Sequence, residues 1–293
     1  MLKISNRNKA VLMVLSAALC FTGMNACVRL AGDLPFIQKG FFRNFVAAIF
    51  AAVTLLKSHT PFKIEKGCGL PMFLRAACGT AGLLCNFYAV DHLDLADASM
   101  LNKLSPFFAV IFSALFLKEK TDLKQTLAII LAFVGSLFII RPSFTNMEFF
   151  PSVIGFLGGM GAGSAYTCVR YMGKHHQNGT VIVLFFSLFS CVVTLPFVII
   201  GFVPMTAKQL FTLLLAGLFA AGGQFSITGA YTYAPASEVS VFDYSQVIFS
   251  AVLGFFLFSQ LPSLLSYVGY AIIILAAVWM YFYNNKKDRK SVQ

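Results

Sequence analysis

Charged residues are scarce in this 293-residue chain, because Asp, Glu, Lys and Arg together make up only 11 % of it. That share is about half of what ordinary soluble domains carry. Apolar residues make up 58 %, and the mean hydropathy is +0.80. The 33 phenylalanines would be difficult to hide in one soluble core of this length. The composition therefore excludes a soluble globular protein and indicates an integral membrane protein.

Motifs for several kinds of chemistry are also missing. The seven cysteines form no CxxC pair, so we expect packing residues rather than metal ligands. The chain holds no P-loop, so ATP is not expected to be the direct energy source. A membrane enzyme would need a clustered catalytic set, and the nearest candidate is DHLDLAD at 91–97, which we interpret as a solvated, capping loop. We predict no enzyme activity, no cofactor and no metal.

Apolar runs of about 20 residues recur along the whole chain, and each is long enough to span a bilayer. Lipid requires the backbone polar groups of a segment to be paired within it, so these runs predict α-helices. The fold class expected is therefore all-α integral membrane. We predict ten spans, at 10–29, 36–56, 69–90, 96–117, 124–141, 152–172, 180–201, 207–230, 236–258 and 263–283.

The basic residues are unevenly distributed. The net charge of +11 could suggest a nucleic-acid partner. Most of the 22 lysines and arginines, however, lie in the segments on the same side as the N-terminus, including the tail NNKKDRKSVQ. This positive-inside bias predicts no nucleic acid, and a multi-pass protein of the cytoplasmic membrane, the inner membrane in a bacterium, with both termini cytoplasmic.

The second half of the chain partly repeats the first at an offset of 141 residues. NACVRLAG (25–32) falls on YTCVRYMG (166–173), and LADASMLNKLSP (95–106) falls on ASEVSVFDYSQV (236–247). Five spans is an odd number, so the second copy must enter the membrane from the opposite side. We predict two inverted five-helix repeats, 1–141 and 142–293, around a central cavity with the substrate site near mid-membrane.

The stretch LNKLSPFFAVIFSALFLKEK (101–120) resembles the Pro-then-apolar-then-Glu signature of the EamA-type drug/metabolite transporters. The Arg of FFRNFVAAIF (41–50) and the five-plus-five repeat are also similar to that family. The second copy departs from the pattern, because Val247 and Gln260 stand where the family repeats its Pro and Glu. The resemblance implies ten helices around a cavity and transport of small metabolites, often amino acids.

The candidates for a functional charge inside the membrane are Arg43, Arg75, Lys103, Glu238 and Asp243. A charge at mid-bilayer costs about 2.5–3.5 kcal/mol on insertion scales, so it usually faces protein or water and usually functions. We expect Glu238 and its repeat equivalent Asp97 to cap helix N-termini, where the helix dipole favours a carboxylate. We expect Arg75 to snorkel to the nearby inner surface.

Asp243 and Lys103 each lie about eight residues into their spans, counted from opposite faces. In straight helices of about 33 Å this places the two charges roughly 10 Å apart along the membrane normal, too far for an ion pair. We expect both to face the cavity, with a buried Lys–Asp pair as the alternative. Asp243 could bind an ammonium group or carry a proton, since burial favours a neutral carboxyl. Lys103 and Arg43 would attract a carboxylate.

Neutral polar groups complete the predicted substrate site. We add Asn25, Asn102, Tyr166, Gln224 and Tyr244 as substrate contacts. Asn86, Tyr231 and Gln246 also lie in apolar spans, where polar residues can equally join helices. The small residues of GFLGGMGAG (155–163) predict close helix packing. Pro106 and Pro196 predict kinks, because proline frees a backbone carbonyl inside a helix.

These observations predict a secondary transporter of a small polar metabolite, an amino acid or similar zwitterion, with Asp243 as the residue that would couple transport to protons. A cationic nucleoside-like metabolite such as S-adenosylmethionine is an alternative substrate, because Asp243 also suits a cation. An integral-membrane enzyme or a non-transporting subunit is the alternative of another class. The expected partners are the substrate, the lipid bilayer and protons, with both a monomer and a homodimer left open.

Overall fold

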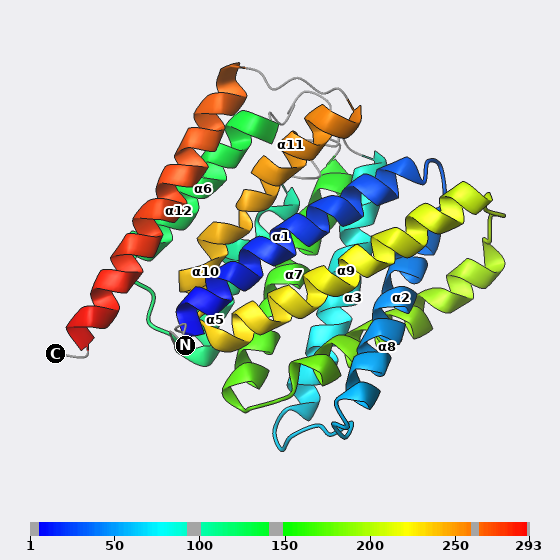
Figure 1. Ribbon diagram of the computed structural model, residues 1–293, viewed down its shortest axis with the longest axis horizontal. Helices are drawn as coiled ribbons and strands as arrows, with labels where there is room; N and C mark the ends of the chain where they lie inside the picture. The colour runs from blue at the N-terminus through cyan, green and yellow to red at the C-terminus, as the bar shows by residue number, and fades with distance from the viewer. Residues whose placement is uncertain (1–5, 93–100, 141–148, 259–263, 292–293) are drawn as a thin grey trace.

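The computed structural model describes residues 6–92, 101–140, 149–258 and 264–291, and in these ranges the protein is helical, with no strand (Figure 1). The helices are α1 (Asn6–Leu30), α2 (Phe36–Lys57), α3 (Gly69–His92), α5 (Ser105–Leu117), α6 (Leu123–Ile140), α7 (Phe149–Lys174), α8 (Gly179–Ile200), α9 (Ala207–Tyr233), α10 (Ala236–Asp243), α11 (Ser245–Phe258) and α12 (Leu264–Ser291).

The helices suit a lipid bilayer. With α10 and α11 taken together as one segment, eight segments are long and apolar enough to cross a membrane, and α5 and α6 are shorter apolar helices. Large apolar side chains such as Ile200, Phe211 and Leu264 are exposed on their outer faces, where lipid would cover them. The ten-helix membrane fold is thereby confirmed. The predicted boundary between the repeats, at 141–142, lies outside the described residues.

The helices pack in pairs that the repeat relates. α1 packs against α9 and α3 packs against α7. Since α7 is the repeat equivalent of α1, and α9 that of α3, these are two copies of the same contact. α2 packs against α8 and α6 against α12, so that each of these helices meets its own equivalent. Inverted repeats about a two-fold axis in the membrane plane produce this pattern.

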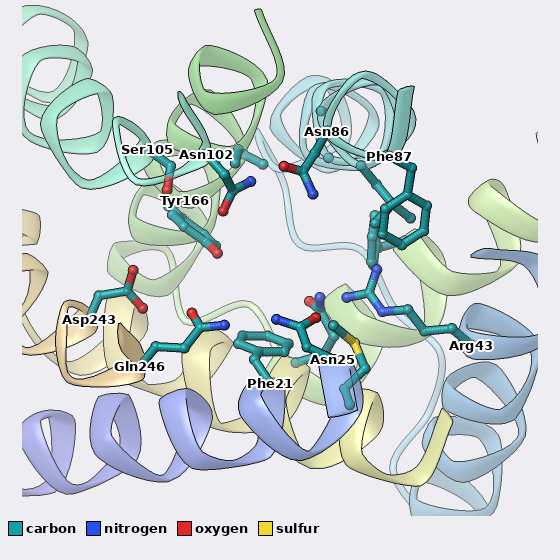
Figure 2. Close-up of a pocket in the computed structure, with 18 of the residues that line it drawn as sticks. Phe21, Asn25, Arg43, Asn86, Phe87, Asn102, Ser105, Tyr166, Asp243 and Gln246 are labelled. Carbon is teal, nitrogen blue, oxygen red and sulfur yellow. The ribbon is translucent and has the colours of Figure 1, made fainter. Parts of the chain in front are cut away.

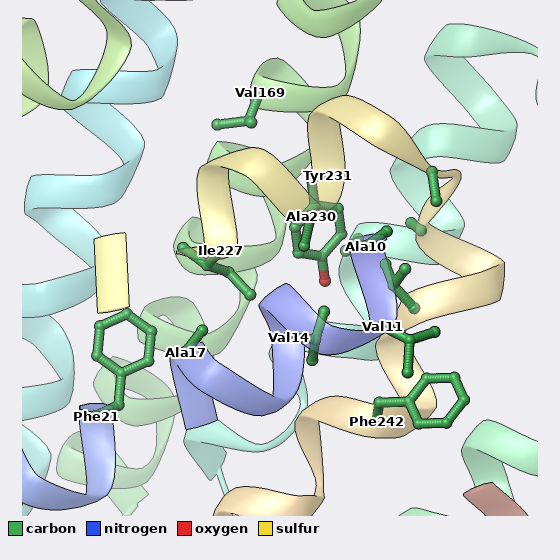
Figure 3. Close-up of a cluster of buried hydrophobic side chains, with 14 of the residues drawn as sticks. Ala10, Val11, Val14, Ala17, Phe21, Val169, Ile227, Ala230, Tyr231 and Phe242 are labelled. Atoms are coloured by element: carbon green, nitrogen blue, oxygen red, sulfur yellow. The ribbon is translucent and has the colours of Figure 1, made fainter. Parts of the chain in front are cut away.

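A cluster of buried apolar side chains extends over most of the helices, and Figure 3 shows the part of it where α1 lies beside α9 and α10. Ala10, Val14 and Ala17 form a narrow, fully buried stripe on α1. Ile227 and Tyr231 of α9 lie beside this stripe and are themselves almost fully buried. Small residues on α1 let the α9 backbone approach, and in a bilayer this close van der Waals packing is what stabilises the contact.

Glycines bring α3 and α7 into close contact, as the small-residue run at 155–163 predicts. A methyl group added at Gly82 would lie 2.9 Å from the Ala162 backbone nitrogen and 3.0 Å from the Gly158 carbonyl oxygen. Only glycine allows the two backbones this approach. The predicted close packing is confirmed, and it forms one wall of the cavity described below.

Two predicted spans are each broken into two helical pieces. In the first half the helix is interrupted by a turn at Lys103–Leu104, and α5 begins at Ser105. In the second half Tyr244 is the turn between α10 and α11. The offset of 141 places Lys103 on Tyr244, so the breaks are repeat equivalents. The kink predicted at Pro106 lies next to the first break, whereas no kink was predicted in 236–258, where the backbone leaves helical hydrogen bonding at Tyr244.

Proline does not explain both breaks. Pro106 lies in the first turn of α5, directly after the first break. Its repeat equivalent is Val247, so the second break forms without a proline. Pro196, by contrast, lies inside the uninterrupted helix α8. Broken helices near mid-membrane are where transporters of inverted-repeat architecture place their sites.

Candidate functional site

A cavity of about 140 Å³ lies between the two halves of the protein (Figure 2). It is lined by residues of α1, α2, α3, α7, α8 and α9 and by residues at or next to the two helix breaks. Seven of the predicted substrate contacts are on its wall: Asn25, Arg43, Asn102, Lys103, Tyr166, Gln224 and Asp243. Asp243 and Arg43 lie on opposite sides of the cavity in Figure 2.

Lys103 and Asp243 are in direct contact across the two breaks. The Lys103 ammonium lies 3.4 Å from the Asp243 carboxylate oxygen and donates a shorter hydrogen bond of 2.7 Å to Gln246 Oε1. Lys103 and Asp243 are 7 % and 6 % exposed, so this is a buried ion pair. The expected separation of roughly 10 Å was wrong. The estimate assumed straight helices, but the helix of each half is interrupted by a turn at or next to these residues.

Tyr244 lies behind this pair and not on the cavity wall. It is fully buried, and its hydroxyl donates a hydrogen bond of 2.9 Å to the Lys103 carbonyl oxygen. That carbonyl has lost its normal partner, because the amide of Phe107 donates to Leu104 instead. An unpaired buried carbonyl is costly. Tyr244 therefore stabilises the first break from the second half of the chain.

Arg43 reaches the cavity from α2. It is 5 % exposed, and within the described residues no carboxylate lies within ion-pair distance of it. Its Nε atom is buried and has no hydrogen-bond partner there. In Figure 2 its guanidinium points into the cavity. A buried cation without a counter-charge is costly, and such a group is suited to bind an anionic ligand.

Arg75 is also on the cavity wall, and the expectation that it snorkels was wrong. It is 2 % exposed, its Nη2 donates a hydrogen bond of 3.0 Å to Gln224 Oε1, and its guanidinium carbon lies 4.2 Å from the centre of the Phe186 ring. Gly79, one turn along α3, makes room for it, because a methyl there would collide with the guanidinium. Contacts of α8 and α9 thus hold Arg75 inward.

Two further kinds of side chain, amides and phenylalanine rings, line the cavity. Asn86 and Gln246 were noted as polar residues in spans but not assigned to the site, and both are on the wall. Phe21, Phe87 and Phe186 add apolar surface. No pattern in the sequence distinguishes these phenylalanines from the many that face outward. The wall therefore combines amides, aromatic rings and charges of both signs.

Tyr166 and its neighbour Tyr231 connect the wall to the core. Their rings stack with centroids 4.8 Å apart, and the Tyr231 hydroxyl lies 3.3 Å from Ser240 Oγ. Tyr166 is the repeat equivalent of Asn25, and both side chains are on the cavity wall. The helices around the cavity are therefore related by a pseudo-two-fold axis, but the side chains at equivalent positions differ, so the site itself is not symmetric.

Ion pairs close the end of the molecule that carries both termini (Figure 1). Arg7 of α1 lies 2.8 Å from Glu238 of α10, and Glu119 after α5 pairs with Arg170 and Lys174 of α7 at 2.8 and 2.7 Å. Glu238 lies in the first turn of α10, at the helix N-terminus where a carboxylate was expected. Its carboxylate also accepts a hydrogen bond from Arg7, which the sequence did not indicate. Asp97 lies outside the described residues.

Amide contacts join the two halves at the opposite end. Gln38 of α2 donates from Nε2 to the Val203 carbonyl at 2.9 Å and accepts from the Val203 amide at 3.0 Å. Gln209 of α9 donates to the Ala31 carbonyl at 3.2 Å. The terminal end has amide contacts as well, because Gln177 accepts from the Glu65 amide at 2.8 Å and donates to the Lys63 carbonyl at 2.9 Å. Amide contacts therefore join the two halves at both ends, and the terminal end adds the ion pairs of Glu119 and Glu238.

The sequence model of the EamA-like transporter family matches residues 8–141 and 150–282. The chain belongs to the EamA-like transporter family. The predicted resemblance is confirmed, and the match in two segments follows the repeat. This family and its named members indicate a multi-pass membrane transporter rather than an enzyme.

Several named transporters are similar to this EamA-like protein over almost its whole length. The pseudopaline exporter CntI of Pseudomonas aeruginosa is 31 % identical over 272 residues, covering 92 % of this chain and 94 % of the relative. The riboflavin transporter of Vibrio cholerae is 26 % identical, with 96 % of each chain covered. A solved crystal structure superposes with a TM-score of 0.77 at 15 % identity and covers 92 % of this chain, which shows the shared fold.

Proposed function

We propose that this EamA-like protein is a secondary transporter that moves a small polar metabolite with a carboxylate and an ammonium group, an amino acid or similar zwitterion, by alternating access. One observation supports this substrate most directly. The cavity between the inverted repeats has the cation Arg43, which has no acidic partner among the described residues, on one side and the carboxylate of Asp243 on the other. A wall with both signs of charge is complementary to a zwitterion.

Each charged group of the substrate has a partner in this arrangement. A carboxylate would accept two parallel hydrogen bonds from the Arg43 guanidinium, whose planar shape matches it. An ammonium would donate to Asp243, whose contact of 3.4 Å with Lys103 is longer than a normal charge-assisted hydrogen bond. The amides of Asn25 and Asn102 would orient the substrate between the two ends.

The pair formed by Lys103 and Asp243 would link binding to movement. It joins the helix break of one half to the break of the other. A substrate ammonium that competes for Asp243 weakens this contact, and so does a proton that neutralises the carboxylate. A ligand shifts a two-state equilibrium only through different affinities for the two states. We propose Asp243 as the group that confers both substrate and proton dependence.

A purely cationic substrate fits this cavity less well. Asp243 already has a cation next to it in Lys103, and the remaining charged groups on the wall are arginines. A ligand such as S-adenosylmethionine would place more positive charge beside them. The charges on the cavity wall therefore favour substrates with a carboxylate over purely cationic substrates.

We also propose a membrane orientation, with the cytoplasmic membrane as the location and both termini in the cytoplasm. The terminal end carries the basic residues Arg7, Arg170 and Lys174 in its ion pairs, and Lys57 ends α2 on that side. Positive charge concentrates on cytoplasmic loops in membrane proteins.

Uptake into proteoliposomes tests the proposed function. The purified protein would be challenged with radiolabelled amino acids, one at a time, with and without an imposed pH gradient. We expect uptake of at least one compound, and loss of that uptake or of its pH dependence in Asp243→Asn. Asp33→Asn is the matched control, because Asp33 is exposed in the α1–α2 connection. Unchanged uptake and pH dependence in Asp243→Asn would contradict the role of this carboxylate.

A further inference from the structure

Among the described residues, the charges on the cavity wall do not balance. Three cations, Arg43, Arg75 and Lys103, face one carboxylate, Asp243. Lys103 and Asp243 neutralise each other as an ion pair. Arg43 and Arg75 are left, and within the described residues neither has an acidic partner. An amino acid with one carboxylate and one ammonium is neutral overall and would leave this excess in place.

We infer that Arg43 and Arg75 form a paired anion subsite, and that the transported metabolite carries at least two carboxylates. This inference rests on the proposed function and narrows its substrate class from a zwitterion to a metabolite with net negative charge. The ammonium position at Asp243 stays as described above. The two arginines then each take one carboxylate.

Neither arginine has all of its hydrogen-bond donors satisfied within the described residues. A structural buried arginine normally has its hydrogen bonds satisfied, because an unpaired buried donor costs free energy. Here Nε of Arg43 and Nε of Arg75 are both buried and have no partner in the described part of the chain. Arg43 and Arg75 are only 5 % and 2 % exposed, so both side chains are buried within the protein.

Three neighbouring residues hold the Arg75 guanidinium in its position on the cavity wall. Gly79 leaves space for the guanidinium, Gln224 accepts a hydrogen bond from it, and Phe186 lies 4.2 Å below it. None of these three neighbours carries a negative charge, so the arginine is oriented while its charge stays available. An oriented but uncompensated guanidinium is suited to bind a carboxylate in a fixed direction.

The two arginines come from different helices, Arg43 from α2 and Arg75 from α3. A ligand that engages both must therefore present its anionic groups to two walls of the cavity. A ligand with a carboxylate at each end of a carbon chain does this, and the experiment below varies the distance between the two carboxylates. A phosphate monoester offers two charges at a single point and is included below as a rival.

Ligand binding to the purified, detergent-solubilised protein tests the inference. The probes are the dicarboxylate series from malonate to pimelate, L-glutamate and L-2-aminoadipate, against acetate, L-alanine, L-lysine and glycerol 3-phosphate. Binding would be measured by the shift in melting temperature and by titration calorimetry. We expect the compounds with two carboxylates to bind, with one chain length preferred, and the single-carboxylate compounds to bind far more weakly.

Arginine variants make the result specific. Arg43→Gln and Arg75→Gln should each weaken dicarboxylate binding by about ten- to hundredfold, the loss expected for one charge-assisted contact. Arg29→Gln is the matched control, because Arg29 is exposed at the end of α1. Binding of L-alanine or glycerol 3-phosphate as tight as that of the dicarboxylates would overturn the inference, as would dicarboxylate binding that neither variant changes or no binding at all.

Flux of the same compounds separates this inference from the proposed function. Uptake of neutral amino acids that is unaffected in both arginine variants would overturn the dicarboxylate inference and leave the transporter intact. Arginine-dependent binding of dicarboxylates with no flux of any compound would support the anion subsite and overturn the transport proposal for those ligands.

Discussion

Each charged side chain in the cavity is held by a different set of contacts. Lys103 is held by Gln246 and Asp243, Arg75 by Gln224 and a phenylalanine ring, and Arg43 has no charged partner within the described residues. These differences have separate consequences for stability and for binding. Removing a partner from the lysine should destabilise the fold, whereas removing Arg43 should chiefly affect the ligand.

The buried pair formed by Lys103 and Asp243 should show strong coupling. Breaking a buried pair on one side leaves an uncompensated charge and costs about 3–5 kcal/mol, whereas replacing both partners is far less costly. We expect Lys103→Met and Asp243→Asn each to lower the melting temperature in detergent, and the double variant to recover most of the loss. The exposed pair Lys63–Glu65 is the control, with an expected effect below about 1 kcal/mol. A double variant that melts lower than both single variants would contradict this coupling.

Gly79 should matter for binding although it carries no side chain. A methyl group there would collide with the Arg75 guanidinium, so Gly79→Ala should turn Arg75 away from its position. We expect ligand affinity to fall about as much as in Arg75→Gln, measured by calorimetry with the tightest probe. Gly69→Ala is the control, because the space around Gly69 is open. Equal affinities in Gly79→Ala and wild type would show that the arginine does not need this space.

Sequence reasoning placed seven of eight proposed site residues on the cavity wall, and it misjudged Arg75. Intramembrane charge is rare, which is why Asp243, Lys103 and Arg43 could be selected. The direction of Arg75 depends on Gly79, Gln224 and Phe186, which lie on three different helices. Contacts between distant helices of this kind leave no local pattern in the sequence.

At the scale of the helices, the two breaks decide where the site forms. Each break frees backbone carbonyls, and both freed carbonyls are used across the interface. The Lys103 carbonyl accepts from the Tyr244 hydroxyl at 2.9 Å, and the Asp243 carbonyl lies 3.5 Å from the Lys103 ammonium. The breaks therefore stabilise each other, and they bring the two halves together at the cavity.

Tyr244 should be needed for the first break. Tyr244→Phe removes the hydrogen bond to the Lys103 carbonyl and leaves that buried acceptor unpaired, at a cost of about 1–3 kcal/mol. We expect a lower melting temperature and weaker ligand binding together, because the Lys103 ammonium is positioned by the same backbone. Tyr267→Phe serves as the control, since Tyr267 is exposed on α12. Weaker binding with an unchanged melting temperature would instead indicate direct contact of Tyr244 with the ligand.

The spans were predictable and the breaks were not. Apolar length sets the spans, and the described helices agree with the predicted ranges to within a few residues, apart from α12, which continues to Ser291. A break needs only a local loss of helical hydrogen bonds and a partner for the freed carbonyls. Pro106 marks one break, but Val247 shows that the other has no such marker. The partner, Tyr244, is identifiable only once the halves are in contact.

At the scale of the whole molecule, contacts between the two halves are found at both ends. The terminal end has ion pairs around Glu119 and Glu238 together with the amide contacts of Gln177, and the opposite end has the amide contacts of Gln38 and Gln209. Alternating access requires each end to open in turn. Substitutions in these separate sets of contacts can therefore probe each end by itself.

Glu119→Gln should loosen the terminal end. Glu119 is the shared partner of Arg170 and Lys174, so its loss leaves two cations close together without a counter-charge. We expect faster hydrogen exchange at the end of α5 and the end of α7, measured by mass spectrometry of the detergent-solubilised protein. Glu65→Gln is the control, because the Glu65 ion pair with Lys63 is exposed. Exchange rates equal to wild type would show that the cluster does not hold this end closed.

The inverted symmetry could be read from the offset of 141 residues, because equivalent helices keep equivalent small residues for packing. Gly82 of α3 and Gly223 of α9 are one such pair, and each lies against the other half of the chain. The site itself is not symmetric: Asn25 and Tyr166 are equivalent in position but differ in chemistry. Symmetry thus predicts where a site lies and leaves its specificity to individual residues.

Solute counterflow tests most directly the central claim, that a single cavity is exposed alternately to the two sides and carries an amino-acid-like metabolite. Proteoliposomes would be loaded with an unlabelled neutral or acidic amino acid, and the entry of a trace of the labelled compound would be followed without any ion gradient. The account predicts a transient accumulation of label above equilibrium for at least one compound, which Asp33→Asn retains and Arg43→Gln loses. Simple equilibration of label with every amino acid would contradict it.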